Sequence, residues 1–222
     1  MSGRTTRDSR LRRAQARELV AGVVGGPAAT RRALARVRDA RAIVLVEGIS
    51  DQIALETLAA RHGRDLAGER IAVVPIGGAQ AITRFLTLFG PQGSDLRLAG
   101  LCDAREETVF GRSLERAGFG AELTRSDMER LGFHVCVEDL EDELIRALGR
   151  ASVEALLRSH GDLGSFRTFQ KQPAWRGQSV DAQLRRFMGS ADRRKLRYAR
   201  LIVEALDLAA VPRPLSAVLA SV

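Results

Sequence analysis

The chain has 222 residues, 45% of them hydrophobic, and its 35 basic and 27 acidic residues give a formal net charge of +8. This length and composition suit a globular protein with one good-sized core. No window holds the roughly 18 apolar residues that a membrane span needs, and the Arg-rich start lacks the apolar stretch of a secretory signal. We therefore expect a cytoplasmic protein without a membrane partner.

The charge is unevenly distributed along the chain. Residues 1–41 hold 11 arginines and three acids, residues 42–160 sum to −6, and residues 161–200 sum to +7. Basic segments bind phosphate backbones by releasing counterions, whereas grouped carboxylates repel DNA unless cations lie among them. Charge alone leaves nucleic-acid binding and a generic Arg-rich surface equally open.

Residues 1–40 form the first predicted segment, an Arg-rich N-terminal arm. Two short helices are expected within residues 9–22 and 27–40, and the GGP sequence between them breaks the helical pattern. We expect the first eight residues to be disordered.

From residue 42 the pattern changes to short apolar runs that alternate with helical segments. The predicted strands are residues 42–46, 71–76, 96–102 and 133–137. The predicted helices between or after them are residues 50–63, 79–90, 106–118 and 138–149. Runs that are apolar on both faces and joined by helices predict an α/β domain over residues 41–150, with a parallel sheet covered on both sides.

Beyond residue 150 the strand-like runs stop. Residues 151–161, 180–189, 192–209 and 214–222 have helical patterns, which predicts a helical C-terminal extension over residues 151–222.

Acidic residues follow two of the predicted strands. Glu47 ends the first strand and Asp103 ends the third, so both should lie where parallel sheets gather their ligands. Asp51 falls one turn into the first helix on the same side, although there it could simply stabilise the helix start, with Ser50 as the cap. Clustered carboxylates raise one another's pKa unless a cation compensates, and oxygen-only ligands suit Mg²⁺ or Mn²⁺.

Other residue types exclude further kinds of site. Cys102 and Cys136 lie in apolar runs as expected buried thiols, and the three histidines lack metal-ligand spacing. Gly77 and Gly78 follow the second strand, where glycines permit either a tight turn or the close approach of a phosphate. No G-x-x-x-x-G-K-[ST] motif occurs, so the sequence contains no P-loop ATPase.

Four motifs together resemble a TOPRIM domain, the metal-binding module of bacterial primases, type IA and type II topoisomerases and the overcoming-lysogenisation-defect (OLD) nucleases. These motifs are "VLVEGISD", "VVPIGG", "LAGLCDAREE" and "VEDLEDELI". The later "RRKLRYARLIVEAL" and "VPRPLSAVL" are similar to the tail that follows TOPRIM in OLD nucleases, so the resemblance extends over roughly residues 40–220. It implies a Rossmann-like domain with about four mainly parallel strands between helices. Because OLD nucleases carry an N-terminal ATPase domain that has no counterpart here, it also implies a stand-alone TOPRIM protein.

The resemblance implies roles for individual acids. Glu47 matches a glutamate that contacts metal or acts as general acid or base, Asp51 a companion acid, and Asp103 a metal-ligating aspartate. Glu141, or with less support Glu143, matches the acid that completes the metal shell. An exposed acidic first turn of a helix is an equally good interpretation of each of these two glutamates.

Arg105 stands where the family has the second aspartate of its D-x-D pair. Arginine cannot ligate Mg²⁺, but it can pair with a phosphate or a neighbouring acid. Lys195 lies in a segment resembling the one that supplies an active-site lysine in OLD nucleases, where its charge would stabilise the transition state.

The same C-terminal region holds the remaining candidates for nucleic-acid contact. Lys171 and Lys195 are the only lysines among 35 basic residues. Arg193 and Arg194 adjoin Lys195 and are candidate backbone contacts. Lys171 and Trp175 lie in a segment that either contacts nucleic acid or anchors a loop to the core.

These observations predict a Mg²⁺- or Mn²⁺-dependent DNA endonuclease with Glu47, Asp103, Lys195 and Arg105 as its catalytic groups. The alternative is a degenerate TOPRIM module that binds nucleic acid or serves a separate ATPase as a subunit, and Arg105 favours it. Strand transfer of the topoisomerase type would need a nucleophilic tyrosine, and Tyr198, the only one, lies inside an Arg-rich helix where packing is the simpler role.

Overall fold

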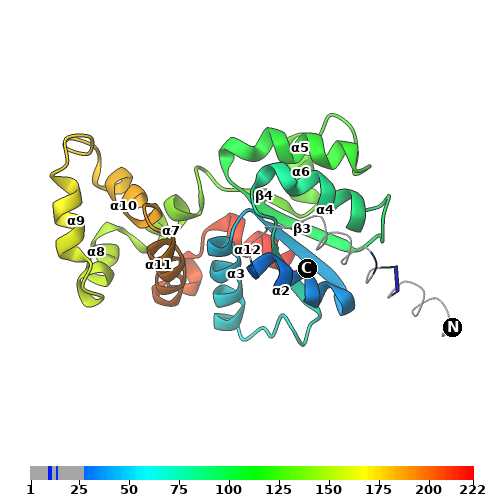
Figure 1. The fold of residues 1–222 in the computed structure, drawn as a ribbon, viewed down its shortest axis with the longest axis horizontal. Helices are drawn as coiled ribbons and strands as arrows, with labels where there is room; N and C mark the ends of the chain where they lie inside the picture. Colours follow the sequence, from blue (N-terminus) through cyan, green and yellow to red (C-terminus); the bar gives the residue numbers. More distant parts are fainter. Residues whose placement is uncertain (1–9, 12–13, 15–27) are drawn as a thin grey trace.

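The computed structural model describes residues 10–11, 14 and 28–222. The predicted helix at residues 9–22 lies almost entirely outside the described residues, and the predicted disorder of the first eight residues lies wholly outside them. Figure 1 shows an α/β part built on a sheet, with a group of helices beside it.

The sheet has four parallel strands, as the sequence predicts, and the structure gives their order as β2-β1-β3-β4. Its strands are β1 (Ala42–Val46), β2 (Ile71–Pro75), β3 (Arg97–Cys102) and β4 (Phe133–Val135). Val46 is paired with Pro75 on one side and Leu101 on the other. The residues that follow β1, β2 and β3 therefore emerge at one edge of the sheet.

Helices cover both faces of the sheet. They are α2 (Ala28–Arg36), α3 (Ile49–Arg61), α4 (Ile82–Phe89), α5 (Glu107–Arg116), α6 (Arg125–Arg130) and α7 (Leu140–Leu148). All five residues of β1 are buried, and they alternate between two core clusters: Val44 packs with α3 residues and Leu45 with residues of α2, α4 and α5. Burial on both faces explains why this strand is uniformly apolar.

The C-terminal helices are not detached from the sheet. They are α8 (Arg150–Ser159), α9 (Leu163–Gln170), α10 (Val180–Gly189), α11 (Asp192–Ala205) and α12 (Arg213–Ala220). Helices α8 to α10 form the group beside the sheet in Figure 1, whereas α11 packs on α3 and α7, and α12 returns to β3 and β4. One apolar cluster thus connects both parts of the molecule.

Two helices, α6 and α9, have no counterpart among the predicted elements. Helix α6 has only six residues, but Thr124 caps it by accepting a hydrogen bond from the Asp127 N–H. The sequence of α9 includes Gly164 and Ser165, which weaken a helical pattern. Phe166 nevertheless buries itself fully in the core, so tertiary packing outweighs local propensity.

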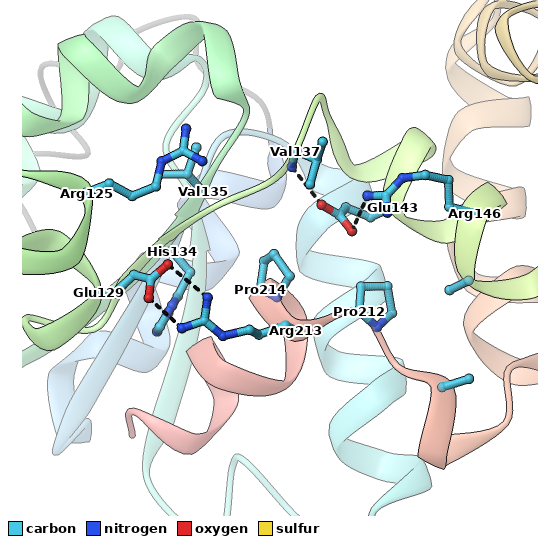
Figure 2. Close-up of a pocket in the computed structure, with 12 residues that line it drawn as sticks. Arg125, Glu129, His134, Val135, Val137, Glu143, Arg146, Pro212, Arg213 and Pro214 are labelled. Carbon is cyan, nitrogen blue, oxygen red and sulfur yellow. Dashed lines mark hydrogen bonds and ion pairs between the residues drawn. The ribbon is translucent and has the colours of Figure 1, made fainter.

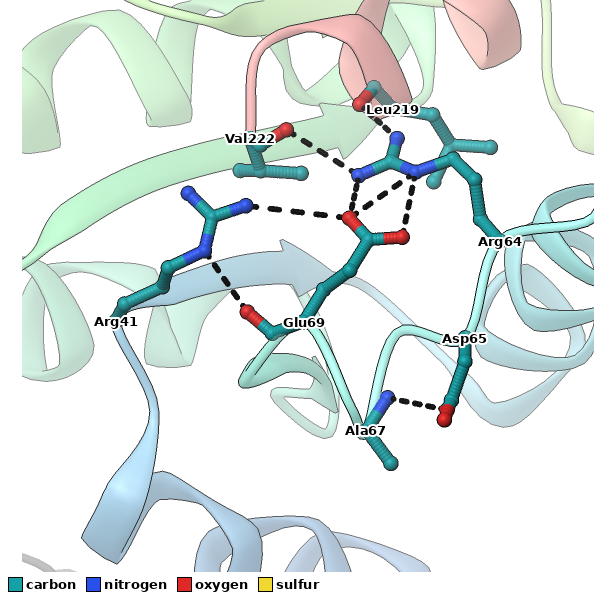
Figure 3. Close-up of polar contacts among 7 residues, drawn as sticks. All are labelled: Arg41, Arg64, Asp65, Ala67, Glu69, Leu219 and Val222. Carbon is teal, nitrogen blue, oxygen red and sulfur yellow. Dashed lines mark hydrogen bonds and ion pairs between the residues drawn. The ribbon is translucent and has the colours of Figure 1, made fainter.

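Arginines near the end of α3 attach the last two long helical segments to the α/β part. Arg61 donates hydrogen bonds to the carbonyls of Val203 and Leu206 at the end of α11. Arg64 donates to the Leu219 carbonyl at 2.6 Å, in the last turn of α12, and to the Val222 carbonyl at 3.3 Å, two residues beyond that helix (Figure 3). These arginines satisfy carbonyls that a helix end leaves without intrahelical partners.

Within the described residues, no helix is both long enough and apolar enough to span a bilayer.

Candidate metal centre

Glu47 and Asp103 meet at the carboxyl edge of the sheet. Glu47 follows β1 directly, Asp103 follows β3, and these strands are neighbours. The Asp103 backbone N–H donates a hydrogen bond of 2.9 Å to Glu47 Oε1. The structure therefore brings together the two acids that the sequence placed at neighbouring strand ends.

Asp51 lies in the first turn of α3 and serves the helix start as well as the acidic cluster. Its Oδ2 accepts a 3.0 Å hydrogen bond from the Gly48 N–H, which stabilises the helix start; the cap is Gly48 and not Ser50, because Ser50 already lies within the helix. The residue is only 8% exposed, and the charges of Glu47 and Glu141 both act on it. Helix capping and membership of the cluster are thus compatible.

The first turn of α7 sends its two candidate glutamates to different places. Glu141 is 8% exposed and its Oε1 lies 3.4 Å from the Lys195 Nζ of α11. Glu143 Oε1 instead accepts a 2.7 Å hydrogen bond from the Val137 N–H, and its Oε2 pairs with Arg146 at 2.7 Å. Figure 2 shows Glu143 in a separate pocket, so its carboxylate is already used there.

The four acids other than Glu143 are Glu47, Asp51, Asp103 and Glu141. All four have raised pKa values, which are typical of a functional site. Burial, followed by the charges of neighbouring acids, raises the pKa of Asp51 to about 7 and that of Asp103 to about 8. Burial also raises the pKa of Glu47 and of Glu141.

Lys195 brings positive charge to this cluster. Burial disfavours its ammonium group, but the charges of Glu141, Asp51 and Asp103 outweigh burial and raise the Lys195 pKa. A single lysine beside four carboxylates leaves the cluster with an excess of negative charge when all are ionised.

Within the described part of the chain, no group of three or more His, Cys, Asp or Glu residues is already arranged to hold a metal ion. The donor set nevertheless fits Mg²⁺ or Mn²⁺ by its chemistry, because all four candidate ligands are carboxylates. Their burial and mutual repulsion also favour added positive charge.

Arg105 lies beside the acidic cluster, and as an arginine it cannot be a ligand of the metal ion. It belongs to the short 3₁₀ helix η3 (Ala104–Glu106), is exposed, and lines a pocket of about 400 Å³ together with Glu141 and Lys195. Of the acids that follow it, Glu107 pairs with Arg125, and the charge of Glu106 contributes to the raised pKa of Glu47.

The structure adds Asp139, Arg185 and Arg186 to the surroundings of the cluster. Asp139 caps α7 by accepting from the Asp142 N–H, pairs with Arg185 Nε at 2.7 Å, and its charge helps to raise the Asp103 pKa. Its position two residues after the fourth apolar run is the signal that could have identified it. Arg185 and Arg186 come from α10 and carry no local signal that connects them to the sheet edge.

Gly77 and Gly78, the glycine candidates for phosphate contact, have a structural role in the turn after β2. Gly77 and Gly78 have φ of +83° and +109°, and both N–H groups donate to the Glu47 carbonyl, at 3.2 and 3.1 Å. The turn uses the amides that a phosphate would need, and it also positions the Glu47 backbone.

The remaining nucleic-acid candidates divide into surface and packed residues. Lys171 and Arg193 are exposed. The Arg194 guanidinium lies 3.9 Å from the centre of the Phe187 ring and donates to the Phe187 carbonyl, so packing occupies it. Trp175 stacks on Phe169 and also lines the 400 Å³ pocket.

Tyr198 is packed as the sequence suggested. It is 1% exposed, its hydroxyl donates to Asp162 Oδ2 at 2.8 Å, and burial raises its pKa. A buried phenol with a raised pKa is a poor nucleophile.

Comparisons with known proteins agree with the fold described above and include the segment that forms the carboxyl edge of the sheet. Residues 40–104 match the family model described as "Overcoming lysogenization defect protein-like, TOPRIM domain". This segment, which includes Glu47, Asp51 and Asp103, therefore resembles a TOPRIM domain of the OLD-like kind, in agreement with the sequence motifs.

Solved structures extend the likeness of fold beyond this segment. The C-terminal region of the Burkholderia pseudomallei OLD protein has a TM-score of 0.62 and 20% identity, over 82% of this chain and 96% of that chain. The C-terminal region of the Xanthomonas campestris pv. campestris OLD protein has a TM-score of 0.60 and 22% identity, over 82% of this chain and 94% of that chain. Curated proteins give no match.

Proposed function

We propose that this protein is a divalent-metal-dependent endonuclease that hydrolyses phosphodiester bonds in DNA. The observation that carries the proposal is the cluster of Glu47, Asp51, Asp103 and Glu141 at the carboxyl edge of the sheet, with Lys195 beside it. Buried acids with raised pKa values cost stability, and such arrangements concentrate at functional sites.

The four acids would hold one or two Mg²⁺ or Mn²⁺ ions. A bound ion of this kind supplies Lewis-acid polarisation of a phosphoryl oxygen and lowers the pKa of a bound water. Glu47, oriented by the Asp103 N–H, is the candidate acceptor for the proton of the attacking water. Lys195 stabilises the negative charge that develops on the phosphoryl oxygens. Arg105, exposed beside the acids, is placed to pair with a substrate phosphate.

The nuclease proposal is tested by nicking of supercoiled plasmid DNA. Wild-type protein should relax the plasmid only when Mg²⁺ or Mn²⁺ is present, and Glu47→Ala and Asp103→Ala should each reduce the rate by about 100-fold or more. Glu56→Ala is the matched control, because Glu56 lies on α3 like Asp51 but forms a surface ion pair with Arg36. Equal nicking by wild type and both site variants would rule out this centre.

A module that binds nucleic acid without cutting it, alone or as the subunit of a separate ATPase, is the second candidate. The observation that favours it is Arg105, a cation at the position of an expected metal-ligating aspartate. Calorimetric titration separates the two. A nuclease should bind Mg²⁺ in a manner that depends on Asp103, whereas a non-cutting module should bind little Mg²⁺ and its titration should be unchanged in Asp103→Asn.

A further inference from the structure

The 400 Å³ pocket beside the acidic cluster is larger than the proposed cleavage chemistry requires. Glu141 and Lys195 line the part of the pocket that adjoins the acidic cluster, where the proposed cleavage would occur. Its remaining surface comes from elements far apart in the sequence: η3, α10 and the loop between α9 and α10. The side chains from these elements that matter here are Arg105, Arg185, Arg186 and Trp175.

Two of these arginines are available to an anion. Arg185 pairs with Asp139 and Glu138, whereas Arg105 and Arg186 are exposed and make no ion pair with any residue in the described part of the chain. The pocket is lined by four cations, Arg105, Arg185, Arg186 and Lys195, and by two acids, Asp139 and Glu141, so positive charge is in excess there. The guanidinium group is planar and forked, which suits bidentate contact with a phosphate.

Trp175 gives the same pocket an aromatic surface. Its ring stacks on Phe169 with centroids 5.2 Å apart and planes inclined by 26°, so one side of the indole is supported. The Trp175 carbonyl accepts a 2.7 Å hydrogen bond from Gln183 Nε2 of α10, which holds the loop against the helix. A supported ring that also lines a pocket is suited to stacking against a flat ligand.

We propose that this pocket binds one unpaired nucleotide of single-stranded DNA next to the bond to be cut, a proposal that rests on the proposed nuclease function. Its base stacks on Trp175, and its flanking phosphates pair with Arg105 and Arg186. Aromatic stacking combined with a basic groove is the usual mode of single-strand binding.

The requirement for an unpaired nucleotide follows from the pocket itself. In a duplex, the faces of each base are covered by neighbouring bases, so an internal base cannot stack on Trp175 without leaving the helix. A pocket of about 400 Å³ has the size of a small-molecule site and not of a duplex-binding groove. The preferred substrate is therefore a single strand, or a strand end or flap that offers one.

The test uses the fluorescence of Trp175, which is the only tryptophan of the chain. Protein in Ca²⁺, an oxygen-ligated cation that neutralises the acidic cluster, is titrated with oligothymidylate and, separately, with a blunt duplex of the same length. Stacking of a thymine base should quench the tryptophan emission with the single strand and leave it nearly unchanged with the duplex. Equal quenching by both, or quenching by neither, overturns the proposal.

Variants in the same titration test the phosphate contacts. Arg105→Ala and Arg186→Ala should each weaken binding of the single strand by about tenfold. Arg158→Ala is the matched control, because Arg158 is an exposed arginine on α8 that does not line the pocket. If both pocket variants bind like the control, the pocket is not the binding site.

This experiment separates failure of the pocket from failure of the nuclease. Binding is read from tryptophan fluorescence and not from nicking, so absence of nicking leaves the titration interpretable. Nicking that depends on Glu47 and Asp103 without single-strand quenching would remove the pocket proposal and leave the nuclease proposal in place.

Discussion

At the residue scale, the dominant feature is the concentration of buried charge at one edge of the sheet. Asp51 and Asp103 have pKa values raised to about 7 and about 8, and Lys195 partly offsets their charge. Buried charged groups lower the stability of a folded chain, and they occur most often at functional sites. Tyr198 shows the contrast, since its buried hydroxyl is hydrogen-bonded to Asp162 and has no access to a substrate.

His134 is a buried titratable residue outside this cluster, and it should make stability depend on pH. It is 7% exposed, and its Nε2 lies 3.2 Å from the Ser221 hydroxyl. Burial lowers its pKa below the usual 6.5; the Glu129 charge opposes this effect and the Arg213 charge adds to it. The unfolded chain therefore takes up a proton on His134 more readily than the folded protein does.

The expected result is that the His134 contribution to the unfolding free energy is complete above pH 6.5 and is lost as the pH falls from 6.5 to the lowered pKa. Urea unfolding at a series of pH values measures this. His134→Gln should flatten the dependence in that window, because glutamine does not titrate. An unchanged slope in the variant would contradict the assignment.

At the element scale, the burial of the strands and the side-chain contacts at helix ends explain most of how the helices and strands are arranged. The central strand β1 is apolar on both faces because core clusters lie on both sides of it. The ends of α11 and α12 are held by Arg61 and Arg64, which donate to their last carbonyls. These contacts join residues about 140 to 160 positions apart in the chain, so no local pattern could have indicated them.

Removing the Arg64 side chain should loosen α12. Arg64→Ala deletes the hydrogen bonds to the Leu219 and Val222 carbonyls and the ion pair with Glu69, which is 2.6 Å long. We expect a loss of about 1–3 kcal/mol in the free energy of unfolding, measured in urea. Arg112→Ala, which removes an exposed arginine from α5, should change stability by no more than about 0.5 kcal/mol. Equal stability of the two variants would show that the Arg64 contacts contribute little.

At the scale of the whole molecule, the candidate site lies where the sheet meets the C-terminal helices. Glu47 and Asp103 come from the sheet edge, Glu141 from α7, and Lys195 from α11, which packs on both α3 and α7. Added positive charge at this junction should therefore stabilise the entire fold, because the acids that it would neutralise belong to several packed elements.

Divalent metal should raise the melting temperature of the protein. At a metal concentration of about 100 times Kd, linkage gives about 2.7 kcal/mol of added stability. For a chain of this size, that corresponds to roughly 5–10 °C. Thermal melts with Mg²⁺, Mn²⁺ or a chelator measure the shift.

Asp103→Asn is the decisive variant in these melts. It should abolish most of the metal-dependent rise. In chelator it should be more stable than wild type near pH 8, because an amide has no charge to bury and is not repelled by the neighbouring acids, the two effects that raise the Asp103 pKa to about 8. The same rise with metal in wild type and variant would exclude Asp103 as part of a metal centre.

The sequence by itself determined the parallel α/β domain and the position of Glu47 and Asp103 at the carboxyl ends of strands. Both follow from short-range information, because apolar runs define the strands and parallel strands present their following residues at one edge. The sequence also favoured a packing role for Tyr198, which is buried, and its motifs resembled the OLD-like TOPRIM domain that residues 40–104 match.

Only the tertiary structure decided which charged side chains share the site. Glu141 and Glu143 are two positions apart on a helix and so point in different directions, and the Val137 N–H together with Arg146 holds one of them away. Asp139, Arg186 and Trp175 reach the same pocket from three elements. Their proximity depends on how α7 and α10 pack, which is set by long-range burial of apolar surface and leaves no periodic signal in the sequence.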